Sequence, residues 1–214
     1  MRKIDLGSIV LPVPEGSRPR LAFGPGDALL AVALLCPFGE VEVRAHAAPK
    51  GGRADLGGQW RSMLTELADQ LRAAGLRLFF QDGPWGRELL AVGGGMFHRL
   101  VGREGDRWTL VAVSVGPDDS AALLADFVHT VLAEAEVRRG DEPQPAKELL
   151  PLRIVDPANL GEWERTDLAL PGPGAPDGAE PDSVEPEPFR PRFPDPEAPG
   201  ARGSAMQQLR ALRP

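Results

Sequence analysis

Three histidines are the residues of this chain best suited to bind a metal or to act as a catalytic base. His46 alternates with Glu42 and Arg44 along an expected strand, which places it on the polar face. His98 falls in a short expected strand, and His129 falls on the expected solvent side of a helix. No metal-binding spacing such as HExxH joins the three. We therefore expect no metal site among them.

The other chemical signals are equally sparse. Cys36 is the single cysteine, which excludes an intrachain disulfide and a cysteine-based zinc site, and its apolar surroundings in the sequence favour a small buried side chain. Ser114 has no glycine two residues before it, so it is not a nucleophile elbow. The run 93–95 is three glycines but lacks a phosphate-binding spacing, which favours a bulge or close backbone approach. We expect no cofactor.

Trp85 stands between Gly-Pro and Gly at the tip of an expected turn. It is either a lid over the edge of the core or an exposed anchor for a partner protein. Candidate partner contacts near it, or on the polar strand, are Arg87, Arg44 and His46. The alternative is a small-ligand or catalytic site assembled from scattered residues, for which we name Arg107, Arg44, His46 and Glu88.

Alternating and helical periodicities indicate the elements that must position these side chains. Strands are expected at 9–13, 20–23, 29–35, 40–48, 76–81, 87–92, 96–101 and 107–116. A first helix is expected after Asp55 as N-cap, reaching Ala74, and a second from Asp119 or Ser120 to about Arg139, with Arg138 and Arg139 in its last turn. Short strands joined by tight turns predict an α+β fold: a largely antiparallel sheet of about seven strands with two long amphipathic helices.

Composition divides the chain into two parts. Residues 1–156 are expected to form a single α+β domain, and residues 157–214 a disordered tail, because the latter are rich in proline, glycine and acidic residues. Within the tail a short helix is possible at 204–213, where Met206, Leu209 and Leu212 recur at helical spacing and could contact a partner.

Charge and hydropathy exclude several classes of partner. The net charge of −7 argues against general nucleic-acid binding, which needs clustered lysine and arginine. No uncharged apolar run approaches the ~18–20 residues that span a bilayer. The N-terminal residues lack the apolar region of a secretory signal, so we expect a cytoplasmic protein.

Several segments together resemble one known family. They are residues 5–9 running into 11–14, Ala47-Ala48-Pro49-Lys50, residues 83–89, Gly105-Asp106-Arg107-Trp108, and residues 137–141 running into 149–152. On these segments the chain is similar, over about residues 5–153, to the actinobacterial domain-of-unknown-function 3710 family (DUF3710). The order of strands and helices also resembles the Mog1/PsbP-like α+β sandwich, most members of which bind other proteins.

The chain departs from the family pattern at two places. The family often carries an arginine shortly after the tryptophan of the Arg-Trp strand, where this chain has Val111. The acidic extension common at the family's N-terminus is nearly absent, and acidic, proline-rich sequence lies at the C-terminus instead. The resemblance implies no enzymatic activity. We therefore expect a non-catalytic protein-binding or adaptor module with an unidentified protein partner; the alternative is a small-ligand binder or enzyme.

Overall fold

The structure is a computed structural model that describes residues 1–49 and 58–168. Its strands are β1 (Arg2–Asp5), β2 (Ile9–Val13), β3 (Arg18–Phe23), β4 (Leu29–Cys36), β5 (Gly39–Ala47), β6 (Arg77–Gly83), β7 (Gly86–Gly93), β8 (Met96–Gly105), β9 (Trp108–Pro117), β10 (Glu136–Val137) and β11 (Glu164–Asp167). The two α-helices are α1 (Gln59–Ala73) and α2 (Ala121–Glu134), and short 3₁₀ turns lie at Pro25–Asp27, Asp118–Ser120 and Pro157–Leu160.

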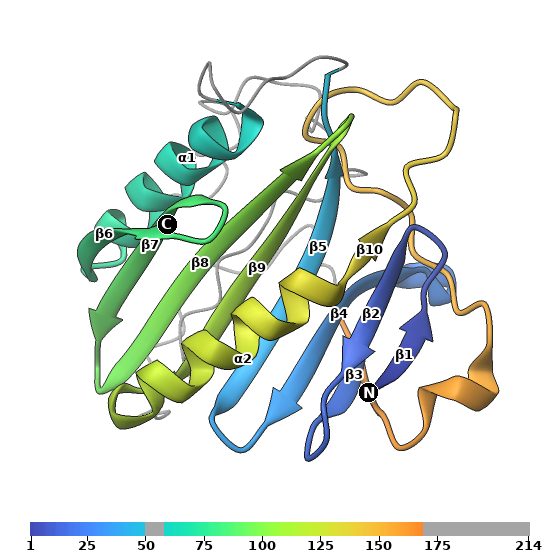
Figure 1. The fold of residues 1–214 in the computed structure, drawn as a ribbon, viewed down its shortest axis with the longest axis horizontal. Coiled ribbons are helices and arrows are strands. Elements are labelled where there is room, and N and C mark those ends of the chain that lie inside the picture. Colours follow the sequence, from blue (N-terminus) through green and yellow to red (C-terminus); the bar gives the residue numbers. More distant parts are fainter. Residues whose placement is uncertain (50–57, 169–214) are drawn as a thin grey trace, which may run out of the picture.

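Eight strands form one large sheet in the order β11-β3-β4-β5-β9-β8-β7-β6, and β1-β2-β10 form a second, smaller sheet. The large sheet is antiparallel throughout except that β11 runs parallel to β3. In Figure 1, α2 and the small sheet lie side by side on one face of the large sheet, and α1 lies over the β6–β8 end of the other face. The predicted α+β class, with two helices on a mostly antiparallel sheet, is confirmed.

Strand alternation divides the apolar side chains between two cores. Leu110 and Ala112 of β9 face α2 and the small sheet, whereas Val111 and Val113 face α1. On α1 the buried residues Trp60, Leu64, Leu67 and Leu71 recur at helical spacing, as the sequence predicted. The central strands are therefore covered on both faces, which explains their continuous apolar runs.

Two strands of the small sheet and one edge of the large sheet escaped sequence analysis. β1 and β11 are mostly charged, and β10 has only two residues, so none shows an apolar pattern.

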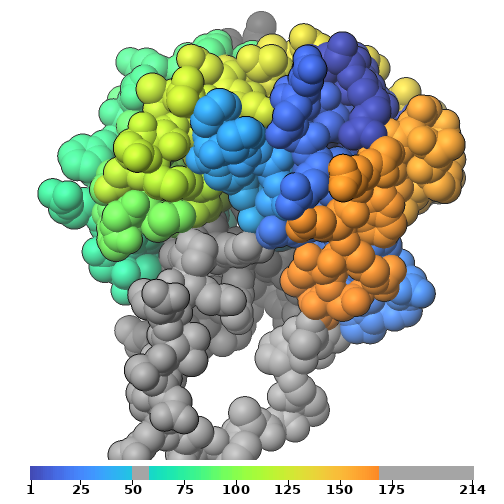
Figure 2. Space-filling model, turned by 90° about the horizontal axis from the view of Figure 1, so that it is seen from below, coloured from blue at the N-terminus to red at the C-terminus, as the bar shows by residue number. Residues whose placement is uncertain are grey.

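The predicted domain boundary at residue 156 needs correction, because Leu160 is buried and β11 pairs with β3. Figure 2 shows this returning segment, in orange, against the blue N-terminal strands. The tail from residue 169, including the helix expected at 204–213, lies outside the described residues.

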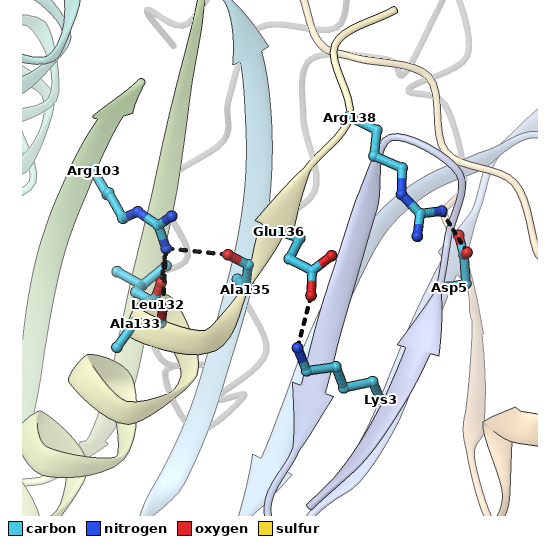
Figure 3. A network of polar contacts seen from close by, with 8 residues as sticks. All are labelled: Lys3, Asp5, Arg103, Leu132, Ala133, Ala135, Glu136 and Arg138. Atoms are coloured by element: carbon cyan, nitrogen blue, oxygen red, sulfur yellow. Dashed lines mark hydrogen bonds and ion pairs between the residues drawn. The ribbon is translucent and has the colours of Figure 1, made fainter. Parts of the chain in front are cut away.

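The second helix ends at Glu134, earlier than predicted, because the chain turns extended at Ala135 and pairs with β2 as β10. Arg138 consequently lies outside the helix and forms an ion pair with Asp5 at 2.6 Å (Figure 3). The positive charge expected in the last turn comes instead from Arg103 of β8. Its guanidinium donates to the carbonyl oxygens of Leu132 and Ala135, where a cation complements the helix dipole.

The first helix begins at Gln59 with Gly58 as its N-cap, so Asp55 is not the cap that we expected. A carboxylate from strand β8 fills this role: Glu104 Oε1 accepts a hydrogen bond from the Trp60 backbone N–H at 2.9 Å. Glu104 follows Arg103 in β8, so two adjacent residues on opposite faces of the sheet cap two different helices with the charge that each helix end favours.

The β8–β9 turn also differs from the prediction. Arg107 has a φ of 67° and lies in the two-residue turn between Gly105 and Trp108, which pair with each other. Tight hairpin turns require positive φ values, so the turn geometry takes Arg107 out of the strand.

Among the described residues, no helix is long and apolar enough to cross a membrane.

Candidate functional site

The face of the large sheet that carries α1 is covered only at its β6–β8 end by the described helices and strands. Beyond α1, this face holds a hollow of about 400 Å³ over β3, β4, β5 and β9. Its lining combines apolar side chains with charged ones: Leu35, Val113 and Val115 with Arg18, Arg20, Glu40 and Glu42. Another hollow, lined by residues that include Ala48, Trp108 and Lys147, is smaller at about 200 Å³.

The charged residues of the hollow are held by one another. Arg20 forms ion pairs with Glu40 at 2.9 Å and with Glu164 of β11 at 3.4 Å. Arg18 reaches the same Glu164 at 2.5 Å and, by its hydrogen bond, lowers the pKa of that carboxyl. The side chains of Arg20 and Glu40 keep 22% and 20% of their surface exposed, so they remain accessible from the hollow. The lowered pKa of Glu164 favours its ionised form, which suits charge recognition better than proton transfer.

Arg44 lies next to the hollow on the same face of β5 and pairs with Glu42 at 2.5 Å. His46, two residues further, is 3% exposed beneath the segment at Lys147–Leu149. Its Nδ1 lies 3.0 Å from the Lys147 carbonyl oxygen, and burial lowers its pKa to about 4. The polar face predicted for this strand therefore holds for Arg44, but His46 is a buried neutral imidazole.

A second group of polar side chains is buried on the opposite face, between β7, β8 and α2. Glu88, 1% exposed, forms an ion pair with Arg99, and its Oε1 is hydrogen-bonded to His129 Nε2 at 2.8 Å. The Trp85 ring lies edge-on to His129 with ring centroids 5.9 Å apart. The prediction that His129 lies on the solvent side of its helix is wrong, because it turns toward Glu88. This cluster fixes the β6–β7 hairpin to α2.

The four residues proposed for a scattered site do not come together. Arg44 and His46 lie on the α1 side of β5, Glu88 lies on the α2 side of β7, and Arg107 lies in a turn. In the described part of the chain no group of three or more histidine, cysteine, aspartate or glutamate residues could hold a metal ion.

Two of the predicted partner contacts occupy the β6–β7 end. Trp85 is half-buried against the core beneath α2, as the lid interpretation describes, while Arg87 is exposed and lies 5.8 Å from the Phe80 ring centroid. Met206, Leu209 and Leu212 lie outside the described residues.

Sequence reasoning missed the hollow itself. The signal was present in Arg18 and Arg20 on one strand and Glu40 and Glu42 on another, all at alternate positions. Tight turns before and after β4 indicated that β3 and β5 flank it, but the sequence did not indicate that these charged side chains would lie on one face over an open hollow. It also missed the exposed pair Phe79 and Phe80, because an apolar strand looks the same at an edge as in a core.

Comparison with known proteins identifies the family. The chain belongs to the family described as "Protein of unknown function (DUF3710)", which matches residues 1–160. No curated protein matches it.

Two solved structures are similar in fold at low identity. One, a crystal structure from Bacteroides thetaiotaomicron VPI-5482, is 16% identical with a TM-score of 0.40 over 67% of this chain; the match spans only 51% of the Bacteroides chain, about half its length. The other, the solution structure of cyanobacterial PsbP (CyanoP) from Synechocystis sp. PCC 6803, is 11% identical with a TM-score of 0.41, covering 64% of this chain and 92% of that one. Both are too distant to bear on the function of this chain.

Proposed function

We propose that this domain is a non-catalytic protein-binding module that receives an extended segment of a partner protein in the hollow over β3–β5. The observation that carries the proposal is the open half of the α1-side sheet face, where no described helix or strand lies over the hollow. α1 covers the β6–β8 end of the same face, and α2 and the small sheet lie on the opposite face.

The lining of the hollow fits a protein segment. Leu35 and Val115 offer apolar contact, while Arg20 and Glu40 offer one charge of each sign. Paired charges on an apolar floor are typical of interface surfaces, where the rim is polar and fixes the register of the partner.

A cytoplasmic location is part of the same proposal. Its support is the single cysteine, Cys36, which cannot form an intrachain disulfide and whose thiol pKa is raised by burial. The partner should accordingly be sought in a cytoplasmic extract.

The test is affinity capture with mass spectrometry, using the full-length protein and a Val115→Trp variant. The indole should fill the hollow from its half-exposed floor position, so a stoichiometric partner protein should be lost at least tenfold. Val155→Trp is the matched control, because Val155 is 49% exposed and is not among the residues lining the hollow. A partner retained equally by both tryptophan variants would overturn the assignment of the hollow.

A small ligand is the second candidate, favoured by the size of the hollow. Its volume of about 400 Å³ falls within the range of roughly 300–1,000 Å³ typical of ligand pockets. Native mass spectrometry of the same preparations distinguishes the two candidates. A metabolite that is retained by the wild type and lost from Val115→Trp, with no protein partner, would establish the small-ligand function.

A further inference from the structure

Strand β6 ends the large sheet and exposes an apolar stretch along its free edge. In the strand order it has β7 on one side and no described strand on the other. Phe79 and Phe80 are 51% and 46% exposed. Leu78, which precedes them in β6, is half-buried. Exposed apolar edge strands are templates for pairing with another strand, and proteins normally shield them.

The β6–β7 hairpin determines which backbone groups of β6 are free to pair. Its turn has two residues, and Gly83 pairs with Gly86 across it. The closing pair of such a hairpin exchanges hydrogen bonds, and the pattern then alternates along the strand. By this alternation Gln81 and Phe79 point their N–H and C=O groups toward β7, so those of Leu78 and Phe80 point away from the sheet.

Two copies can pair along this edge only in a few registers. If the two-fold axis is perpendicular to the sheet, the α1-bearing faces of both copies lie on the same side of the joined sheet. In that arrangement one residue of β6 must lie opposite the same residue of the second copy. With Phe79 at that position, Leu78 lies opposite Phe80 of the second copy. The backbone N–H and C=O groups of both residues point away from β7, so the two residues can hydrogen-bond to each other across the interface. With Phe80 there instead, Leu78 would face Asp82 and Phe79 would face Gln81.

The register centred on Phe79 also continues the apolar rows of the sheet. On the α2 side Phe79 is the register partner of Leu90, so the row across the interface would read Leu90, Phe79, Phe79, Leu90. On the other side Leu78 is the partner of Ala91 and Phe80 is the partner of Leu89, both buried. Arg77 would face Gln81, and no like charges would be opposed.

We propose that β6 pairs with β6 of a second copy of this chain, antiparallel and centred on Phe79, so that two large sheets join into one. This surface is distinct from the hollow over β3–β5, and the inference does not depend on the proposed function. A contact made by one strand from each copy is small, below ~1,200 Å², so the dimer should be weak, with a dissociation constant of about 10–100 µM.

Sedimentation velocity on the full-length protein tests this inference across that concentration range. The wild type should shift from monomer to dimer. Phe79→Lys and Phe79→Glu should each remain monomeric, because each places like charges opposite one another. An equimolar mixture of the two should dimerise again, since position 79 meets its own equivalent only in this register.

Phe80→Pro provides an independent check. It removes an N–H that points away from β7, so the hairpin is retained while the outer ladder is blocked, and this variant should be monomeric with a melting temperature within a few degrees of wild type. A wild type that stays monomeric to about 500 µM would overturn the inference. So would a dimer that survives Phe80→Pro, or lysine and glutamate variants that fail to associate when mixed although each is folded by circular dichroism.

Discussion

At one edge of the large sheet, β11 carries a charged residue at three of its four positions, whereas at the other edge β6 exposes two phenylalanines. Every charged side chain of β11 has a partner: Glu164 pairs with Arg18 and Arg20, and Arg165 pairs with Asp167 at 2.8 Å and with Asp27 at 2.6 Å. Short length and fixed charge are the usual means of shielding an edge. β6 has seven residues, and its charges lie near its ends.

The two edges are also held in place by different forces. The segment bearing β11 is anchored by one buried apolar residue, Leu160, and by exposed ion pairs. The β6–β7 hairpin is held on both faces of the sheet. α1 packs on one face, and the cluster of Glu88, Arg99 and His129 links the hairpin to α2 on the other. Loss of one partner from a polar contact should therefore cost more stability where the contact is buried, while at the exposed edge the charges mainly prevent further strand pairing.

Replacing one carboxylate in each region should produce the largest difference in stability between the two. Glu88→Ala leaves the Arg99 guanidinium buried without its carboxylate, which should lower the free energy of unfolding by about 3–5 kcal/mol. The matched control is Glu164→Ala, which removes exposed pairs and should unfold close to wild type. Urea titrations of both variants give the two values. Equal losses would contradict the distinction between buried and edge contacts.

Removal of the β11 edge should have the next largest effect. A chain ending at Asp156 loses the buried Leu160 side chain, worth about 1.5–3 kcal/mol, and leaves β3 as a new unshielded edge. A chain ending at Leu168 keeps both features. Thermal melts and light scattering should show the shorter chain to be less stable and prone to aggregate. Identical behaviour of the two chains would mean that β11 does not shield the sheet.

Acid should act on the centre of the sheet before it acts on the edges. Burial lowers the pKa of His46 to about 4, so the folded protein holds this imidazole neutral while the unfolded chain binds a proton below about 6.5. The stability from neutral His46 is complete above pH 6.5 and is lost as the pH falls toward 4, by about 2 kcal/mol at pH 5.

Urea titrations at pH 7 and pH 5 measure this loss. His46→Asn, which keeps a donor near the Lys147 carbonyl but does not titrate, should lose less stability over the same interval. An equal loss in both proteins would assign the acid sensitivity to other groups and leave the edge carboxylates as candidates.

Much of the fold could be predicted from the sequence because alternation and helical spacing report which face of an element is buried. The strand 9–13 and the apolar face of the first helix were predicted within a residue or two for this reason. The helix caps could not be predicted in the same way. Arg103 and Glu104 cap helices distant in the chain, so their roles depend on where β8 passes.

The candidate sites divide along the same line. Arg44 was correctly placed on a polar strand face, and Trp85 was correctly placed in a turn between glycines. The partners of Glu88 were not predicted, because Arg99 and His129 come from separate elements on the α2 side. A polar residue on a helix looks solvent-facing until the neighbouring strand supplies a partner.

The amino-acid sequence alone is enough to predict an α+β domain with amphipathic helices on an antiparallel sheet, since those properties follow from local periodicity and turn residues. Tertiary contacts set which strands lie at the edges, which sheet face is open, and which charged side chains meet. Those outcomes depend on strand order, and β11 reaches β3 across more than a hundred residues of intervening chain. Residue patterns within one segment carry no record of such contacts, because local periodicity is the same whichever strand lies alongside.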